Sequence, residues 1–231
     1  MKRKIYLSVT FFMAVLISRA QVKQGEILLG GNVGFSTEKD SPPDPNRGYQ
    51  KSLTNIFIGP SYGKAIKDNL LAGFDLNYTA GINEQDYSAA GVPGQGYALH
   101  SHNYGAGVFI RKYKYLGSGF CLFMQGRLGG AYNTQKTIYT DSQNPDMDAK
   151  GYTVTLGFYP GISYAICKRV QLETGFQNLA YMQYSHQQDT YQPGFSNTPI
   201  RFNVNSFSLG SSFNSSLSGF IVGVRFLLGG S

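Results

Sequence analysis

The residues best suited to chemistry are the three histidines. His100 and His102 flank Ser101, and His186 lies three residues before Asp189. Such groups could supply a Ser–His pair for lipid deacylation or a His pair for a metal ion. Neighbouring residues of a strand point to opposite faces, and no carboxylate is placed to orient either ring of the first pair. We therefore expect no catalytic residue, no metal site and no cofactor, and interpret the histidines as solvated loop residues.

Two cysteines, Cys121 and Cys167, are too few for a disulfide scaffold, and no metal-binding spacing is present. Both should lie near the same end of the expected strands. The sequence leaves two alternatives open, a disulfide between them or two inert thiols.

Five charged residues are expected to share the polar face of the strands. They are two carboxylates and three guanidinium groups: Asp75, Arg111, Arg127, Glu173 and Arg225. A buried unpaired charge is costly, so these side chains should form an ion-pair and hydrogen-bond network inside the protein. We interpret this network as structural filling of the interior, with a gated ion path as the alternative.

Alternation of apolar and polar residues with a period of two predicts the elements that position these charges. Leu29, Gly31, Val33 and Phe35, for example, share one face, with small or polar residues on the other. Eight such segments fall at about 29–36, 55–62, 72–79, 105–111, 122–129, 153–164, 170–177 and 220–228. Residues 203–216 could extend the last strand or form an additional strand, making the count ten; we favour the extension.

The connections between these segments alternate in length. Short links near 67–69, 115–118 and 167–169 alternate with polar segments at 38–50, 83–99, 134–150 and 185–203. Short periplasmic turns and long extracellular loops are typical of bacterial outer-membrane barrels. The fold class predicted is therefore all-β, an antiparallel up-and-down transmembrane β-barrel of eight strands with both termini periplasmic.

Aromatic residues and prolines mark particular positions in this plan. Tyrosines fall at or near strand ends, where phenol rings suit the headgroup zone of a membrane: Tyr62, Tyr78, Tyr132, Tyr164 and Tyr181. Pro60 and Pro160 cannot donate to a strand ladder, so we expect a β-bulge at each.

The first twenty residues have the pattern of a signal peptide. A basic start is followed by an apolar run at 5–17, and Ala20–Gln21 is the expected cleavage site. Residues 21–231 then form the barrel domain. Removing the four basic residues of the leader lowers the formal net charge from +7 to +3, so we expect no nucleic-acid partner. The 29 glycines, 33 Tyr and Phe residues and absence of Trp fit a closed all-β architecture.

Three segments carry a family resemblance: Ile58–Tyr78, Val108–Tyr132 and Tyr159–Phe176. Each runs from a strand through a tyrosine and a tight turn to a strand with an apolar-Gly pattern. They resemble the outer membrane protein β-barrel domain family of Bacteroidetes, relatives of the small OmpA/OmpX-like barrels and of PorT-like proteins. The resemblance implies location in the outer membrane, contact with its lipid and lipopolysaccharide, and insertion by the barrel-assembly machinery.

These observations favour a barrel without catalytic activity, acting in envelope structure or in surface binding through its extracellular loops. An eight-stranded barrel is just wide enough for its own side chains, which argues against a diffusion pore. The alternatives are transport of ions or small solutes, an accessory role in a secretion machinery with an unknown envelope partner, or a lipid-modifying barrel enzyme.

Overall fold

The computed structural model describes residues 22–40, 47–89, 95–140, 146–176, 179–191, 198–211 and 220–229. The expected signal peptide and its cleavage site at Ala20–Gln21 lie outside these residues. Within the described ranges, no helix is long and apolar enough to cross a membrane.

The described chain is almost entirely antiparallel β-structure, as predicted. Its strands are β1 (Ile27–Asp40), β2 (Arg47–Lys67), β3 (Leu70–Ala89), β4 (Gln95–Gly117), β5 (Phe120–Tyr139), β6 (Met147–Cys167), β7 (Val170–Phe176), β8 (Ala180–Tyr191), β9 (Ile200–Gly210) and β10 (Phe220–Leu228). The expected count of eight is therefore wrong: the described ranges contain ten strands. The polar segments after Phe176 and before Phe220 pair with each other as β8 and β9 instead of extending the neighbouring strands without a break.

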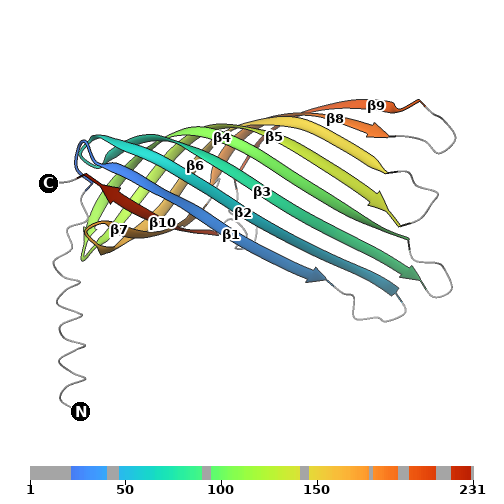
Figure 1. Cartoon of the computed structure of the whole chain (residues 1–231), viewed down its shortest axis with the longest axis horizontal. Helices are drawn as coiled ribbons and strands as arrows, with labels where there is room; N and C mark the ends of the chain where they lie inside the picture. Colours follow the sequence, from blue (N-terminus) through green and yellow to red (C-terminus); the bar gives the residue numbers. More distant parts are fainter. Residues whose placement is uncertain are drawn as a thin grey trace, which may run out of the picture.

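Eight of the ten strands form a closed ring. The order β1-β2-β3-β4-β5-β6-β7-β10 returns to β1 through the pairs from Ile27↔Leu228 to Val33↔Val222. Figure 1 shows this closed part at the end marked C, with β1, β10 and β7 side by side. Closure leaves no free strand edge at this end, and a free edge would be very costly in a lipid environment.

At the opposite end the sheet opens between β1 and β9. β6 pairs with β8 as far as Phe158 and with β7 from Gly161 onward. In the part of the chain that the structure describes, β9 pairs only with β8, and β1 beyond Val33 pairs only with β2. The strands β8 and β9 thus project from the ring at the far right of Figure 1.

The two prolines do not produce the expected bulges. The register is unshifted around Pro60 and around Pro160, so that prediction is wrong. Pro160 instead lies where β6 changes partner from β8 to β7. Because proline has no backbone N–H, it suits a position at which one ladder ends and the next begins.

The short connections agree with the sequence prediction, whereas the long ones do not. Two-residue turns at 68–69, 118–119 and 168–169 join neighbouring strands, with Asn69 and Ser118 at positive φ of 58° and 49°. Most of the expected loops at 38–50, 83–99, 134–150 and 185–203 are strand. Their polar residues lack the apolar alternation that marks a membrane strand, yet the backbone ladder continues through them.

Inside the turn end of the ring lies a small apolar cluster. Its most deeply buried members are Val22, Leu28, Leu71 and Cys121, each at most 1% exposed. The segment before β1 folds beneath the ring, where the Val22 carbonyl accepts a hydrogen bond of 2.8 Å from the Asn69 N–H. This cluster closes the turn end of the interior.

Candidate functional site

The five charges expected on the polar face all lie on the inward side of the ring, in two groups. The group nearer the turn end is a triad of Arg111, Glu173 and Arg225, with side chains at most 5% exposed. Arg111 Nη1 donates to both Glu173 oxygens at 2.7 Å. Arg225 Nε approaches Glu173 Oε2 at 3.1 Å, an ion pair whose geometry leaves Nε without a hydrogen bond.

Neighbouring side chains hold the triad in place. Arg111 Nε donates to Gln125 Oε1 at 2.7 Å, and the Tyr113 hydroxyl donates to Glu173 at 3.0 Å. The Arg111 guanidinium also lies 4.4 Å from the centre of the Phe123 ring, within the range of a cation–π contact. The Glu173 carboxylate is therefore surrounded by donors and cations.

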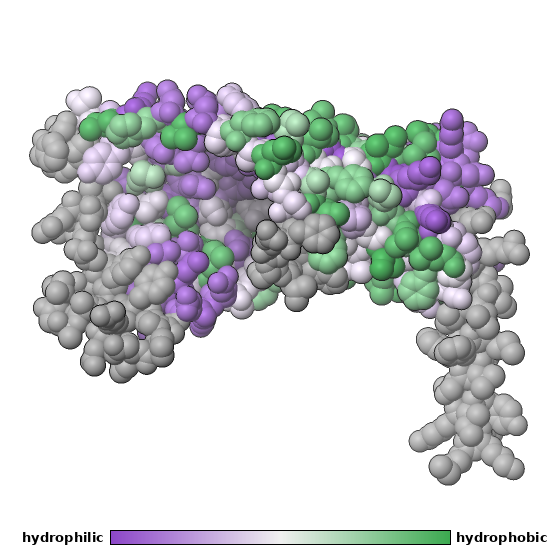
Figure 2. Space-filling view, turned by 180° about the vertical axis from the view of Figure 1, so that it is seen from behind, coloured by the Kyte–Doolittle hydropathy of each residue, from purple (hydrophilic) through white to green (hydrophobic). Residues whose placement is uncertain are grey.

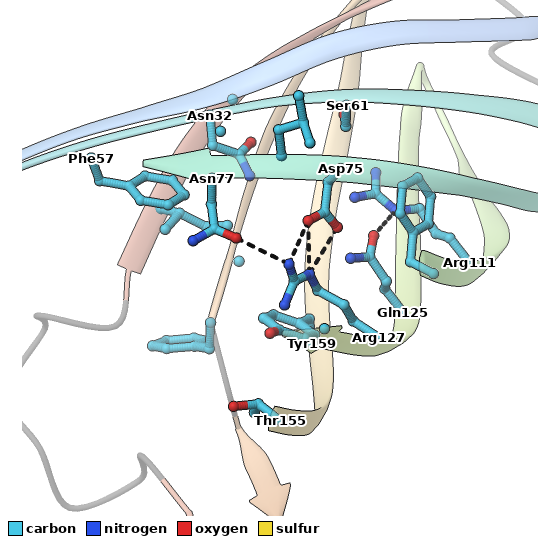
Figure 3. Close-up of a pocket in the computed structure, with 18 of the residues that line it drawn as sticks. Asn32, Phe57, Ser61, Asp75, Asn77, Arg111, Gln125, Arg127, Thr155 and Tyr159 are labelled. Carbon is cyan, nitrogen blue, oxygen red and sulfur yellow. Dashed lines mark hydrogen bonds and ion pairs between the residues drawn. The ribbon is translucent and has the colours of Figure 1, made fainter. Parts of the chain in front are cut away.

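The second group, one layer farther from the turn end, pairs Arg127 with Asp75. Arg127 donates through Nε and Nη2 to Asp75 at 2.5–2.9 Å, and through Nη2 to Asn77 at 3.2 Å. Figure 3 shows the two charged groups facing each other, with Tyr159 beside the guanidinium. Gly107 contacts this guanidinium, and an added Cβ there would come within 2.6 Å of it. Glycine therefore leaves room for the guanidinium, which would have to shift if a larger residue stood there.

A chain of amide hydrogen bonds crosses the wall from Asn77. Asn77 Nδ2 donates to Asn103 at 3.1 Å, Asn103 donates to Asn133, and Asn133 donates to Thr153 at 2.8 Å. Each amide accepts on one side and donates on the other, so the bonds polarise one another in one direction. Sequence reasoning placed none of the Asn103, Asn133 and Thr153 side chains in a site. Alternation along their strands could have put them on the inward face.

These groups line a cavity of about 340 Å³ inside the ring. Its charged lining residues are Asp75, Arg111, Arg127, Glu173 and Arg225, the five residues that the sequence brought to attention. Amide and hydroxyl groups make up most of the remaining polar lining. The lining can bind and orient a polar solute, but it offers no nucleophile paired with a general base.

The outward side of the ring is apolar and bounded by tyrosines. In direct register across β3, β4, β5 and β6 lie Tyr78, Tyr104, Tyr132 and Tyr152. The Tyr78 and Tyr104 rings are 5.1 Å apart. Sequence analysis singled out two of the four; Tyr104 and Tyr152 end the apolar faces of their strands and were identifiable on that ground.

On the turn side of this tyrosine row, large apolar side chains face outward. Exposed fractions are 59% for Val108, 52% for Leu128 and 52% for Leu156. Figure 2 shows such hydrophobic side chains gathered over the right-hand half of the molecule, with hydrophilic ones lining the hollow left of centre. Tyr181 was expected at the membrane boundary with the other tyrosines, but it lies opposite Gly157. It is on the same face of β8 as Gln183, which lines the cavity, so it faces inward.

The histidines lie in strands instead of loops, which corrects the sequence interpretation. His102 stacks on Tyr78, with its Nδ1 3.0 Å from the phenol oxygen, whereas the Ser101 hydroxyl donates to the Gly81 carbonyl. His100 lies on the same strand, β4, two residues away. No Ser–His contact is formed there.

His186 and Asp189 are not partners either. The His186 ring nitrogen lies 2.7 Å from Asn205 Oδ1, and Asp189 accepts a hydrogen bond from Gln187. No group of three His, Cys, Asp or Glu side chains that could hold a metal ion occurs among the described residues.

The two cysteines form no disulfide, which decides between the alternatives left open by the sequence. Cys121 is buried in the apolar cluster, and Cys167 is exposed at the end of β6.

Comparison with known proteins gives limited information. No family model matches the chain, and no curated protein matches it. Among solved structures, the Neisserial surface protein A is 18% identical, with 88% of this chain and 99% of that chain covered, at a TM-score of 0.36. The translocator domain of the autotransporter NalP from Neisseria meningitidis is 10% identical, with 97% and 94% covered, at a TM-score of 0.33. Both TM-scores are low.

Proposed function

We propose that the chain is a non-catalytic outer-membrane β-barrel that acts through the surface it presents outside the cell. The observation that carries this proposal is the combination of an apolar outward face, a tyrosine row at its boundary and a polar, charged interior. In water the reverse arrangement would be favoured, because exposed apolar area is costly there. In lipid, the closed ring satisfies the backbone while the tyrosines occupy the interface.

The strands beyond the tyrosine row provide the surface that acts. β3 continues for eleven residues from Tyr78 to Ala89, and β4 begins nine residues before Tyr104. At about 3.3 Å per residue, these polar strands extend roughly 30 Å past the row. A paired sheet of this length can hold a binding surface in a fixed shape, in contrast to the long extracellular loops that the sequence suggested.

The start of β1 at Ile27 and the end of β10 at Leu228 lie opposite each other, at the same end of the ring as the short turns. We place that end in the periplasm and the projecting strands outside, as the connection lengths indicate. The resemblance of the three strand-turn-strand segments to small barrels of Bacteroidetes, PorT-like proteins included, belongs to this same proposal. So do contact with lipopolysaccharide and insertion by the barrel-assembly machinery.

Placing arginine on the outward face tests the membrane assignment. Val108 lies midway between Tyr104 and Lys112 on the outward face of β4, so Val108→Arg should cost about 2–4 kcal/mol of folding free energy in a bilayer. Thr134 lies two residues beyond Tyr132 on the outward face of β5, and Thr134→Arg should cost about 0–1 kcal/mol.

Reversible urea unfolding in phospholipid vesicles would measure both costs. Equal costs for the two variants, or release of the wild-type protein into the soluble fraction without detergent, would refute the assignment. A separate planar-bilayer recording addresses transport: the proposal requires a silent membrane, and currents abolished in Arg127→Gln would favour the transport alternative.

A further inference from the structure

The charges on the cavity wall do not balance. Arg127 and Asp75 form a one-to-one pair, whereas Arg111 and Arg225 share the single carboxylate of Glu173. Three cations and two anions line the cavity, which leaves a net charge of +1. Arginine does not lose its proton in proteins, so it cannot remove this excess by neutralising itself.

The excess is located at the triad. Glu173 already accepts from Arg111 Nη1 through both of its oxygens, accepts from the Tyr113 hydroxyl and faces Arg225. Arg225 is 2% exposed, and its Nε lacks a hydrogen bond. Two buried cations that share one carboxylate destabilise the folded protein, and a bound anion would reduce this cost in free energy.

The wall around Arg225 offers further donors to such an anion. Arg225 Nη2 donates to Asn32 Oδ1 at 3.0 Å, which leaves the Asn32 amide N–H groups available. Asn32 and Gln125 line the same cavity as Arg225 and Arg111, whereas the Ser61 hydroxyl already donates to the Gly30 carbonyl. At about 30 Å³ per water molecule, the cavity holds on the order of ten waters, ample room for a small hydrated solute.

We propose that the cavity binds a small anion with a single negative charge, a halide or a carboxylate, against Arg225 and Arg111. One negative charge brings the cavity to neutrality, and a second would restore the imbalance with opposite sign. The site goes beyond the proposed function and requires only the folded ring, so it stands or falls independently of the membrane in which the barrel resides.

Chloride-35 NMR of the folded protein in non-ionic detergent tests the site directly. The wild type should broaden the chloride resonance beyond detergent alone, and added acetate or nitrate should reverse the broadening. Arg225→Gln leaves Arg111 and Glu173 as a balanced pair and should lose the excess broadening. The matched control is Lys136→Gln, which removes one cation from an exposed position outside the ring's interior and should broaden chloride as the wild type does.

The outcomes separate clearly. Absence of excess broadening in the wild type, or equal broadening in Arg225→Gln and Lys136→Gln, overturns the proposal. Should Arg225→Gln fail to fold, Asp75→Asn provides a second test: it removes a carboxylate from the partly exposed pair and raises the excess in the cavity to two cations, so it must bind chloride more tightly than the wild type. The anion that displaces chloride at the lower concentration identifies whether a carboxylate or an inorganic ion is the preferred ligand.

Discussion

Replacing Glu173 by glutamine should destabilise the barrel more than any other single change in its interior. The carboxylate is 4% exposed and accepts from Arg111 at 2.7 Å while facing Arg225 at 3.1 Å. Glutamine keeps the size but leaves two buried cations side by side. Removing one partner of a buried ion pair costs about 3–5 kcal/mol, a large share of the 5–15 kcal/mol that typically stabilises a folded domain.

The free energy of unfolding is best measured by urea titration in detergent micelles. The chain has no tryptophan, so tyrosine fluorescence and far-UV circular dichroism provide the signal. Asp75→Asn is the matched control, because the Asp75–Arg127 pair is 14–15% exposed and involves one cation. Solvent reaches that pair, so its loss should be the smaller of the two.

A second substitution in the same protein tests whether charge imbalance causes this loss of stability. Adding Arg225→Gln to Glu173→Gln removes one of the two repelling cations and should recover part of the lost stability. If Glu173→Gln costs no more than Asp75→Asn, or if the double variant is less stable than the single one, charge imbalance is not what governs this part of the interior.

Two further predictions concern packing and thiols. Gly73→Ala should lower the free energy of unfolding by about 1–3 kcal/mol, because the added Cβ would overlap the Tyr62 carbonyl. Gly126→Ala is the control: an added Cβ there has its nearest neighbour at 3.9 Å, so the same urea titration should show no change in stability. In the folded protein a charged maleimide should label Cys167 and leave Cys121 unmodified until urea is added, as mass spectrometry would show; a disulfide resistant to labelling at both positions would contradict the structure.

On the proposed membrane assignment, alternation in the sequence predicted the ring because contact with lipid on one face requires it. Where one face of a strand meets lipid and the other a polar interior, as from Leu29 to Phe35, residue types must alternate. Beyond the tyrosine row both faces of the sheet are wet, and the requirement disappears. The segment from Asn83 to Ala89 therefore looked like loop, although it pairs with β2 along its length and with β4 as far as Tyr87.

The partners of the interior charges could not be predicted in the same way. Alternation places Arg111 on β4 and Glu173 on β7 on the inward face, but these strands are not neighbours in the sheet. Their contact spans the interior and depends on the stagger of every strand between them. The change of partner of β6 at Pro160 was unpredictable for a similar reason. A proline shows where a backbone N–H donor is missing, but it does not show which strand pairs next.

The arrangement of layers inside the ring decides from which side a solute can arrive. An apolar floor that includes Leu28 and Leu71 lies at the turn end, and the segment at Val22 folds beneath it. Passage through that end would require these side chains to leave contact with one another and meet water, at about 25 cal/mol for each Å² exposed. The amide-lined end carries no such apolar layer among the described residues, and it leads to the opening between β1 and β9. On this arrangement a solute that reaches Arg225 is expected to enter and leave by the same end, which favours a binding cavity over a passage.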